Sequence, residues 1–338
     1  NNQAQAILSS RGLNNLIVNS GGLPLESLHL GLNGREASLL LPNGYALSRE
    51  SFDQALIDAA VKAGASTRFQ VTAQVETARP GYRSVRLKDH QSGAISHVRA
   101  RVVLVAAGLS HRCLPNYEAA HTRIEKQSRH GAGCVVEDGS HHYPAGAIHM
   151  AIGDHGYVGL VRREDGLLNL AGAFDRDALS QHQGAATTAQ HVLNQAGFPV
   201  PEAIQEGQRW QRTPALSRSS ELVAGERFLV MGDAAGYVEP FTGEGMAWAL
   251  TAGAAVTPFV LEGVHQWSED LEARWKQALK LQIGRRQTLC RALSMVLKRK
   301  GPTAILFELV RRWPALADPI VSSLNEVQLP SAKGEACL

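Results

Sequence analysis

Residues 228–252 read FLVMGDAAGYVEPFTGEGMAWALTA, and this stretch decides the fold. The apolar run from Phe228 to Met231 predicts a buried strand, which leads directly into Gly232 and Asp233. Further along, a Gly-Glu-Gly sequence opens an apolar helix near Gly245. Open α/β sheets bind ligands outside the carboxyl ends of their strands. The stretch therefore predicts a ligand-binding edge in an α/β fold.

Three positions in this stretch have a chemical reason to face a ligand. Asp233 follows the strand immediately, at the edge where such sheets bind their ligands. Gly243 and Gly245 flank the helix start, where residues without side chains let backbone N–H groups approach a ligand. The amino end of a helix also favours partial negative charge. The alternative interpretation is an ordinary turn followed by a helix start.

Other segments predict further pieces of the α/β fold. Val102–Val105 predicts a strand buried on both faces, which ends in the small residues Ala106-Ala107-Gly108. Ser48 predicts the cap of an amphipathic helix that ends at Gly64, and the Asn33-Gly34 turn between apolar runs predicts a hairpin over residues 28–41.

The middle and the end of the chain have different patterns. From Gly131 to Phe174, short apolar runs alternate with Gly and Asp turns, which predicts an antiparallel sheet in a second domain. From Trp267 onward the pattern is helical, with breaks at Gly301-Pro302 and Trp313-Pro314. We therefore expect a helical C-terminal region.

Length and composition exclude several classes of protein. The chain has 338 residues, enough for about two domains of roughly 150 residues each. Its 44% apolar content supports a packed core and excludes a disordered chain, and its net charge of +3 argues against a nucleic-acid-binding protein. The four cysteines lie far apart, without a CxxC pair or a Cys/His cluster at zinc spacing. The sequence thus predicts a reduced, cytoplasmic setting and no metal site.

The sequence predicts neither a signal peptide nor a membrane span. The first residues lack a basic start followed by an apolar run. The longest uncharged stretch, Met246–Leu261, contains Gly253 and Pro258 and is shorter than the roughly 20 residues that a span needs. We expect a soluble protein, or at most a peripheral one.

Charge is concentrated near the end of the chain. Residues 274–312 carry eleven Lys and Arg and a single acid, so this segment has a net charge of +10 and the remainder −7. Apolar residues are interleaved with the basic ones. The default interpretation is a solvated helix face, and the alternative is a peripheral membrane contact through the basic helices 274–312.

The sequence GDAAGYVEPFTGEGMAWAL resembles the second FAD fingerprint of the superfamily of para-hydroxybenzoate-hydroxylase-type monooxygenases, flavin halogenases and geranylgeranyl-reductase-like enzymes. The EPFTGEGM segment is most similar to the reductase-like branch. Two further segments agree in order: residues 47–53 resemble the LSRxxFD helix start of the family, and residues 102–108 resemble the strand and turn beside the nucleotide half of FAD. The likeness extends from about Asn1 to Leu261.

The resemblance implies a set of cofactor-binding residues. Asp233 would bind the ribityl hydroxyls, and the backbone from Gly243 to Met246 would face the pyrimidine end of the flavin ring. Arg49 would reach the cofactor, although a solvated helix-start residue is the alternative, and Gly108 is either a cofactor contact or a tight turn. The full predicted set is Arg49, Gly108, Gly232, Asp233, Ala234, Pro240, Gly243, Gly245 and Met246. No catalytic acid or base is identified.

The chain departs from the family in one respect. Members begin with a strand and a GxGxxG turn that holds the FAD pyrophosphate, and neither Gly21-Gly22 nor residues 31–34 have that spacing. We therefore expect an N-terminally incomplete, Rossmann-like FAD/NAD(P)-binding domain. The expected domains are a discontinuous FAD-binding domain (1–22, 43–113 and 213–264), a β-rich substrate domain (23–42 and 114–212) and a helical C-terminal region (265–338).

The function implied by the resemblance is that of an FAD-dependent oxidoreductase. It would act on a small, lipophilic organic substrate, with NAD(P)H as electron donor, either by hydride transfer to a double bond or by hydroxylation. Neither the WxWxIP segment of halogenases nor the YxWxFP stretch of geranylgeranyl reductases occurs, so the substrate is left open. The alternative is a truncated remnant without cofactor or activity.

Overall fold

The computed structural model describes residues 1–110, 112–115, 122–205, 208–239 and 241–329. The chain divides into two compact units. The first unit comprises Asn1–Ala59, Lys126–Leu216 and Cys290–Val327, and the second comprises Ala60–Glu125, Ser217–Leu289 and Gln328–Leu338. Helices α3 (Arg49–Lys62) and α10 (Glu269–Leu297) begin in one unit and end in the other.

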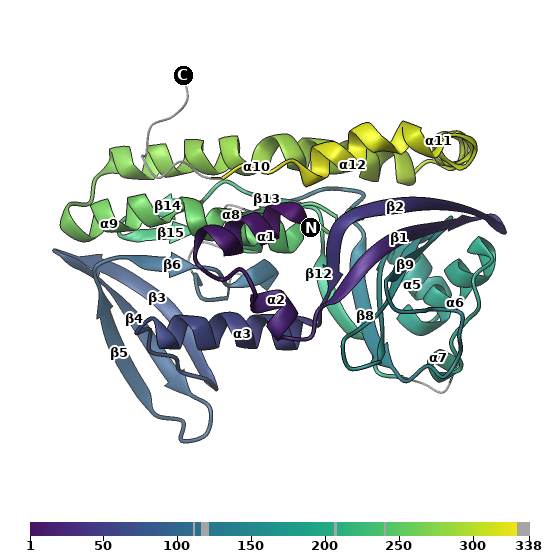
Figure 1. The fold of residues 1–338 in the computed structure, drawn as a ribbon. Helices are drawn as coiled ribbons and strands as arrows, with labels where there is room; N and C mark the ends of the chain where they lie inside the picture. The colour runs from purple at the N-terminus through teal and green to yellow at the C-terminus, as the bar shows by residue number, and fades with distance from the viewer. Residues whose placement is uncertain (111, 116–121, 206–207, 240, 330–338) are drawn as a thin grey trace. The chain divides into compact units, whose positions relative to one another are not determined.

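The first unit is built on a seven-stranded sheet with the order β12-β8-β11-β10-β9-β1-β2. All neighbouring pairs are antiparallel except β1 and β9, which run parallel. The antiparallel sheet predicted over 131–174 is therefore confirmed, and the predicted hairpin belongs to the same sheet (Figure 1). The strands are β1 (Leu23–Leu32), β2 (Arg35–Ala46), β8 (His130–Val136), β9 (Ala147–Gly153), β10 (Gly156–Arg162), β11 (Leu168–Phe174) and β12 (Gln211–Ala215).

The hairpin between β1 and β2 closes through Asn33 and Gly34, as the sequence predicted. Leu32 pairs with Arg35, so the turn has two residues. Both turn residues have positive φ angles, 50° for Asn33 and 71° for Gly34. Such angles match the twist of the flanking strands and explain why an Asn-Gly pair stands here.

Helices cover this sheet on both faces. On one face, α6 packs against β9 and β10 and buries a helical stripe that includes Val192 and Leu193 against the fully buried Leu160 and Leu170. On the other face, Val310 packs with Leu39 of β2. The helices of this unit are α1 (Asn2–Ser10), α2 (Leu16–Asn19), most of α3, α5 (Arg176–Gln181), α6 (Ala185–Ala196), α7 (Glu202–Gln205), α11 (Lys300–Arg312), η3 (Pro314–Ala317) and α12 (Asp318–Asn325).

The second unit contains three small sheets and the helices that follow them. The strands β3 (Val71–Arg79), β4 (Tyr82–Asp89) and β5 (Ile95–Ala100) form an antiparallel sheet. A second sheet has the order β14-β15-β6, and a third has the order β16-β13-β7. Their strands are β6 (Val103–Val105), β7 (Thr122–Ile124), β13 (Arg218–Ser220), β14 (Ala224–Gly225), β15 (Phe228–Val230) and β16 (Gly236–Tyr237). The other elements are η1 (Gly108–Ser110), η2 (Gly232–Ala235), α8 (Gly245–Ala255), α9 (Thr257–His265) and most of α10.

The strand predicted from Phe228 is confirmed as a buried, parallel strand, because all of β15 is buried and it pairs in parallel with β6. The prediction that the strand over 102–105 is buried on both faces is wrong for Leu104, which is 43% exposed. Its neighbour Leu229 lies under α9 and α10, packed with Leu271 and Trp275. In the described part of the chain, α9 and α10 do not cover Leu104 in this way.

Helices α8 and α9 form the single segment, Gly245–His265, that by length and apolar composition could cross a membrane. This statement concerns the described part of the chain. Of its most apolar 18-residue stretch, 44% is buried inside the protein. Val256 and Phe259 of this segment pack with Leu271 and Trp275 in the second unit.

The amino end of α3 is held by a carboxylate from the loop between β10 and β11. As predicted, the Ser48 hydroxyl caps the helix by accepting the Ser51 N–H at 3.1 Å. The Glu164 carboxylate accepts the Ser48 N–H at 2.9 Å and both serine hydroxyls at 2.5 and 2.7 Å. Partial burial by itself would raise the pKa of Glu164, but the hydrogen bonds from Ser48 and Ser51 outweigh it and lower the pKa to about 2.

We expect the substitution Glu164→Gln to lower the free energy of unfolding by about 1 kcal/mol at pH 7, after allowance for solvent screening. Because the pKa of Glu164 is lowered on folding, its contribution is present above the ordinary value of 4.5 and is lost as the pH falls towards about 2. Urea unfolding at pH 7 and pH 3 measures this. The exposed Glu202→Gln is the control, and equal losses in the two variants at pH 7 would contradict the assignment.

Candidate functional site

The carboxyl ends of β6 and β15 bring two short loops to the same edge of their sheet. The strands run parallel in register from Val103 opposite Phe228, and the pairing continues as the Met231 N–H donates to the Val105 carbonyl at 2.9 Å. The helical turn η1 follows β6, and η2 follows β15. The two turns contact each other. Parallel pairing therefore places the Gly108 loop beside the Gly232–Asp233 loop, as expected for a ligand-binding edge.

Glycine is required in both loops by the backbone. Gly108 has a φ angle of 66° and Gly232 one of 61°, in the left-handed region that disfavours other residues. The space beside them is also open. A Cβ on Gly108 would meet no described atom within 4 Å, and one on Gly232 would touch only the Ala249 Cβ at 4.0 Å. At these two glycines the loops therefore present accessible backbone.

Helix α8 lies against the same edge. The helix begins at Gly245, packs on η2, and has no side-chain cap among the described residues. Gly243, just before the helix, has a φ angle of 69° and no described atom within 4 Å of where its Cβ would lie. An amino end without a side-chain cap leaves N–H groups and partial positive charge for an anionic or hydrogen-bond-accepting ligand.

The structure thus brings together most of the residues that the sequence singled out. Gly108 lies in η1, and Gly232 and Asp233 lie in η2, which contacts both η1 and α8. Gly245 and Met246 are the first residues of α8, and Gly243 precedes this helix. Ala234 lies in η2, but its side chain is fully buried in the core with Val105 and Phe228, so its backbone alone could face a ligand. Pro240 lies outside the described residues.

Arg49 belongs to the first unit. Its guanidinium is 67% exposed and pairs with Asp53 one helical turn later, at 2.9 Å. This is the geometry of a surface ion pair, which contributes little to stability. A role for Arg49 at a cofactor stays a prediction, as does the cofactor role of the other residues in the set.

A buried arginine that the sequence analysis missed supports the Gly108 loop. Arg218 of β13 is 7% exposed and donates to the Leu109 carbonyl of η1 at 2.8 Å. A charge-assisted hydrogen bond to a carbonyl in a buried setting fixes the position of the loop. The only sequence signal was a charged residue between two serines in a weak strand pattern, which does not distinguish Arg218 from an exposed arginine.

A buried ion pair holds the start of α8. Glu244, the residue before the helix, is 2% exposed, and Arg286 of α10 is 8% exposed. The Arg286 guanidinium donates to the Glu244 carboxylate at 3.4 Å. Arg286 was counted with the basic segment that was expected to lie on a solvated or membrane-facing surface, and its burial corrects that expectation for this residue. Nothing in the spacing of 244 and 286 predicts the pair.

Two polar residues on the sheet of the first unit are part of its core. Tyr157 is 4% exposed and His149 is 8% exposed. The His149 ring stacks on His29 at 4.8 Å and meets Phe198 edge-on. Burial, and next the neighbouring His29, lower the pKa of His149 to about 4, so its ring is neutral at physiological pH.

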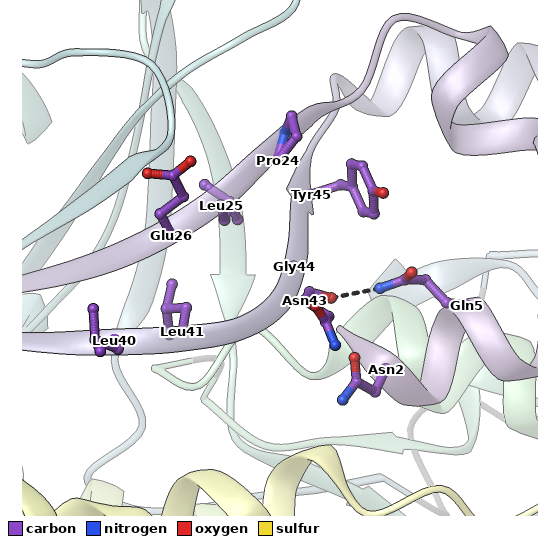
Figure 2. Close-up of a pocket in the computed structure, with 10 residues that line it drawn as sticks. All are labelled: Asn2, Gln5, Pro24, Leu25, Glu26, Leu40, Leu41, Asn43, Gly44 and Tyr45. Atoms are coloured by element: carbon purple, nitrogen blue, oxygen red, sulfur yellow. Dashed lines mark hydrogen bonds between the residues drawn. The ribbon is translucent and has the colours of Figure 1, made fainter.

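A groove of about 480 Å³ lies elsewhere in the first unit, between α1 and the β1–β2 hairpin. Figure 2 shows Leu25, Leu40 and Leu41 of the hairpin along it, with Gln5 of α1 donating to the Asn43 carbonyl at 2.5 Å. Leu40 is 87% exposed. The residues that line the groove do not form a cluster of titratable groups. We therefore take the loops at the β6–β15 edge as the candidate functional site.

No model of a known protein family matches the chain. A curated relative is digeranylgeranylglycerophospholipid reductase 2 of Methanopyrus kandleri, which is 24% identical over 274 residues, covering 73% of this chain and 66% of the relative. Among solved structures, the flavin-dependent brominase Bmp2 superposes with a TM-score of 0.73 at 14% identity, covering 96% of this chain and 82% of the brominase.

Two further solved structures have the same fold. The p-nitrophenol 4-monooxygenase PnpA from Pseudomonas putida DLL-E4 superposes with a TM-score of 0.71 at 13% identity, covering 96% of this chain and 87% of that one. The flavin-dependent halogenase CmlS superposes with a TM-score of 0.66 at 17% identity, and the match covers 82% of this chain and 54% of CmlS. These neighbours are enzymes, and the chain has the α/β fold of the FAD-dependent oxidoreductase-type flavoproteins, as predicted.

We expect Glu244→Gln and Arg286→Met each to lower the free energy of unfolding by about 3 kcal/mol, because each leaves a buried charge without this partner. The double variant should lose less than the sum of the two single losses. Urea unfolding followed by tryptophan fluorescence measures the cycle. The exposed pair Arg123 and Glu221, 2.8 Å apart, is the control, with losses below about 1 kcal/mol. Strictly additive losses at 244 and 286 would show that the pair is not coupled.

Proposed function

We propose that this chain is the flavin-binding part of an FAD-dependent oxidoreductase and that the site at the β6–β15 edge holds the flavin. Asp233 would accept hydrogen bonds from the ribityl hydroxyls, and the backbone at Gly243–Met246 would face the pyrimidine end of the ring. The single observation that carries this proposal is the packing of the Gly232–Asp233 loop against α8, whose Ala249 lies beside Gly232. The superpositions on flavin-dependent enzymes support the fold, and the site geometry supports the assignment of the flavin to this edge.

The physical properties of the site fit a flavin. Open glycines at 108, 232 and 243 allow close approach to a flat, bulky group. The amino end of α8 favours negative charge, and a reduced flavin ring is anionic. The buried pair of Glu244 and Arg286 fixes this helix end, and Arg218 fixes the facing loop. When bound, FAD would supply the hydride and electron chemistry.

The reaction class we propose is reduction of a double bond in a lipophilic substrate, with NAD(P)H as electron donor. The printed name of the curated relative, a digeranylgeranylglycerophospholipid reductase, supports this choice. The EPFTGEGM sequence, which is most similar to the reductase-like branch, supports it as well.

Hydroxylation is the second candidate, because the chain shares its fold with a p-nitrophenol monooxygenase. The products separate the two reactions, since only hydroxylation consumes dioxygen and adds an oxygen atom to the substrate. A protein that binds no cofactor is the third interpretation, and absence of flavin binding would favour it.

We expect the chain to bind riboflavin, FMN and FAD, since the proposed contacts involve the ring and the ribityl chain that all three share. The substitution Asp233→Ala should weaken binding of each about 10- to 100-fold, as expected for the loss of charge-assisted hydrogen bonds. Quenching of flavin fluorescence measures the affinity. The exposed Asp58→Ala is the matched control. Unchanged affinity of the Asp233 variant would refute the ribityl role.

We also propose that α11 and the turn after it contact a membrane surface. Thr303, Phe307 and Val310 of α11 are buried. The opposite face presents a stripe of exposed apolar side chains that continues into η3. These are Ile305, Leu309, Trp313 and Leu316, which are 65%, 39%, 56% and 53% exposed.

Basic residues surround this stripe, which makes an anionic lipid surface the matching partner. Arg299, Lys300, Arg311 and Arg312 are all exposed. An amphipathic helix with basic flanks and apolar anchors, one of them tryptophan, is typical of interfacial helices. Association with a lipid surface would suit a lipophilic substrate.

The chain should sediment with vesicles that contain phosphatidylglycerol and not with pure phosphatidylcholine vesicles, and salt should weaken the association. The substitution Ile305→Asp should weaken binding about tenfold or more, because insertion of an isoleucine is worth about 1.5–3 kcal/mol. Leu261→Asp, at an apolar residue of α9 that is 62% exposed, is the control. The contact is disproved when wild-type protein stays in the supernatant or when both variants bind equally weakly.

A further inference from the structure

Three histidines that are far apart in the sequence meet in the first unit. His155 lies in the turn between β9 and β10, His182 caps the carboxyl end of α5, and His191 lies in α6. One ring nitrogen from each lies within 4.8 Å of the others. The rings of His182 and His191 stack with centroids 4.7 Å apart, and His155 lies 5.7 and 6.0 Å from them.

The chemistry of this cluster suits a transition-metal ion. Neutral imidazole is a common ligand of Zn²⁺, at about 2.0–2.1 Å. The Nε2 atom of His182 is buried and has no hydrogen-bond partner among the described residues. Burial of a nitrogen without a hydrogen-bond partner is destabilising, and coordination to a metal ion would satisfy it. Tetrahedral coordination would place the nitrogens about 3.4 Å apart, which small side-chain rotations from the present separations can reach.

The backbone around the cluster is anchored, so the three imidazoles are held near one another without a ligand. The Asp175 N–H, at the start of α5, donates to the His155 carbonyl at 2.9 Å. The Asp154 N–H donates to Gln195, one turn beyond His191 in α6, also at 2.9 Å. The Asp154 carboxylate in turn accepts Lys300 at 2.7 Å. Because these hydrogen bonds already order the backbone, metal binding would require less additional ordering of the chain.

We propose that His155, His182 and His191 form a binding site for a divalent transition-metal ion, with Zn²⁺ as the representative ion. Solvent can supply the remaining ligand, because His191 is exposed. The ion would cross-link the β9–β10 turn, α5 and α6, and would thereby stabilise the helical cover of the sheet.

The expectation of no metal site rested on sequence spacing alone, which does not reveal ligands that converge from three separate elements. The proposal does not depend on the flavin site, whose residues lie in the second unit.

The experiment titrates the full chain, after removal of metal with a chelator, with Zn²⁺ and with Co²⁺. We expect one ion per chain, a rise in the thermal unfolding midpoint with Zn²⁺, and visible Co²⁺ absorption bands of a nitrogen-ligated ion. Thiolate-to-metal absorption would instead indicate binding at a cysteine and would overturn the proposal.

Two variants separate the cluster from other histidines. His191→Ala removes an exposed ligand and should leave the fold intact, while weakening Zn²⁺ binding by at least about tenfold. The double variant His141→Ala/His142→Ala removes two exposed histidines of the same unit and should bind Zn²⁺ as the wild type does. Equal affinity of the His191 variant and the wild type would overturn the proposal, and so would the absence of a stoichiometric site in the wild type. Circular dichroism confirms that each variant is folded.

Discussion

Parallel pairing of β6 with β15 is the constraint on which the second unit depends. Two short strands in register force the segments that follow them to leave the sheet at the same edge, which is why η1 and η2 touch although more than a hundred residues separate them. Strand β15 is buried under α10, where the Trp275 indole donates to the Val230 carbonyl at 3.1 Å. The loops at this edge are open in the described part of the chain, with free space beside Gly108 and Gly243.

In this unit, buried charged side chains fix the backbone around the candidate site. Arg218 holds the loop after β6, and Arg286 with Glu244 holds the residue from which α8 begins. Such groups are expensive to bury and are weak evidence for stability, but they specify one arrangement of the elements they join. A helix end and a loop held in this way need little rearrangement to receive a flavin, which agrees with the function proposed for the chain.

The first unit follows a different principle. Its wide sheet is covered by α6 on one face and by α11 on the other. Glu164 at the start of α3 is satisfied by hydrogen bonds from two serines. The cluster of His155, His182 and His191 contains a buried nitrogen that the described residues leave unsatisfied, and this difference makes it a candidate for a bound ion.

Local patterns determined much of this protein. The hairpin at Asn33-Gly34, the cap at Ser48, the strand from Phe228 and the helix start near Gly245 could all be predicted, because turn geometry, capping and apolar runs act over a few residues. The resemblance in residues 232–250 predicted the fold and the residues at the candidate site. Only the tertiary structure decided that Leu104 is exposed, that Arg286 is buried on Glu244, that Arg218 supports the facing loop and that three histidines converge. Each of these depends on which distant element packs against the residue, and sequence spacing carries no information about that.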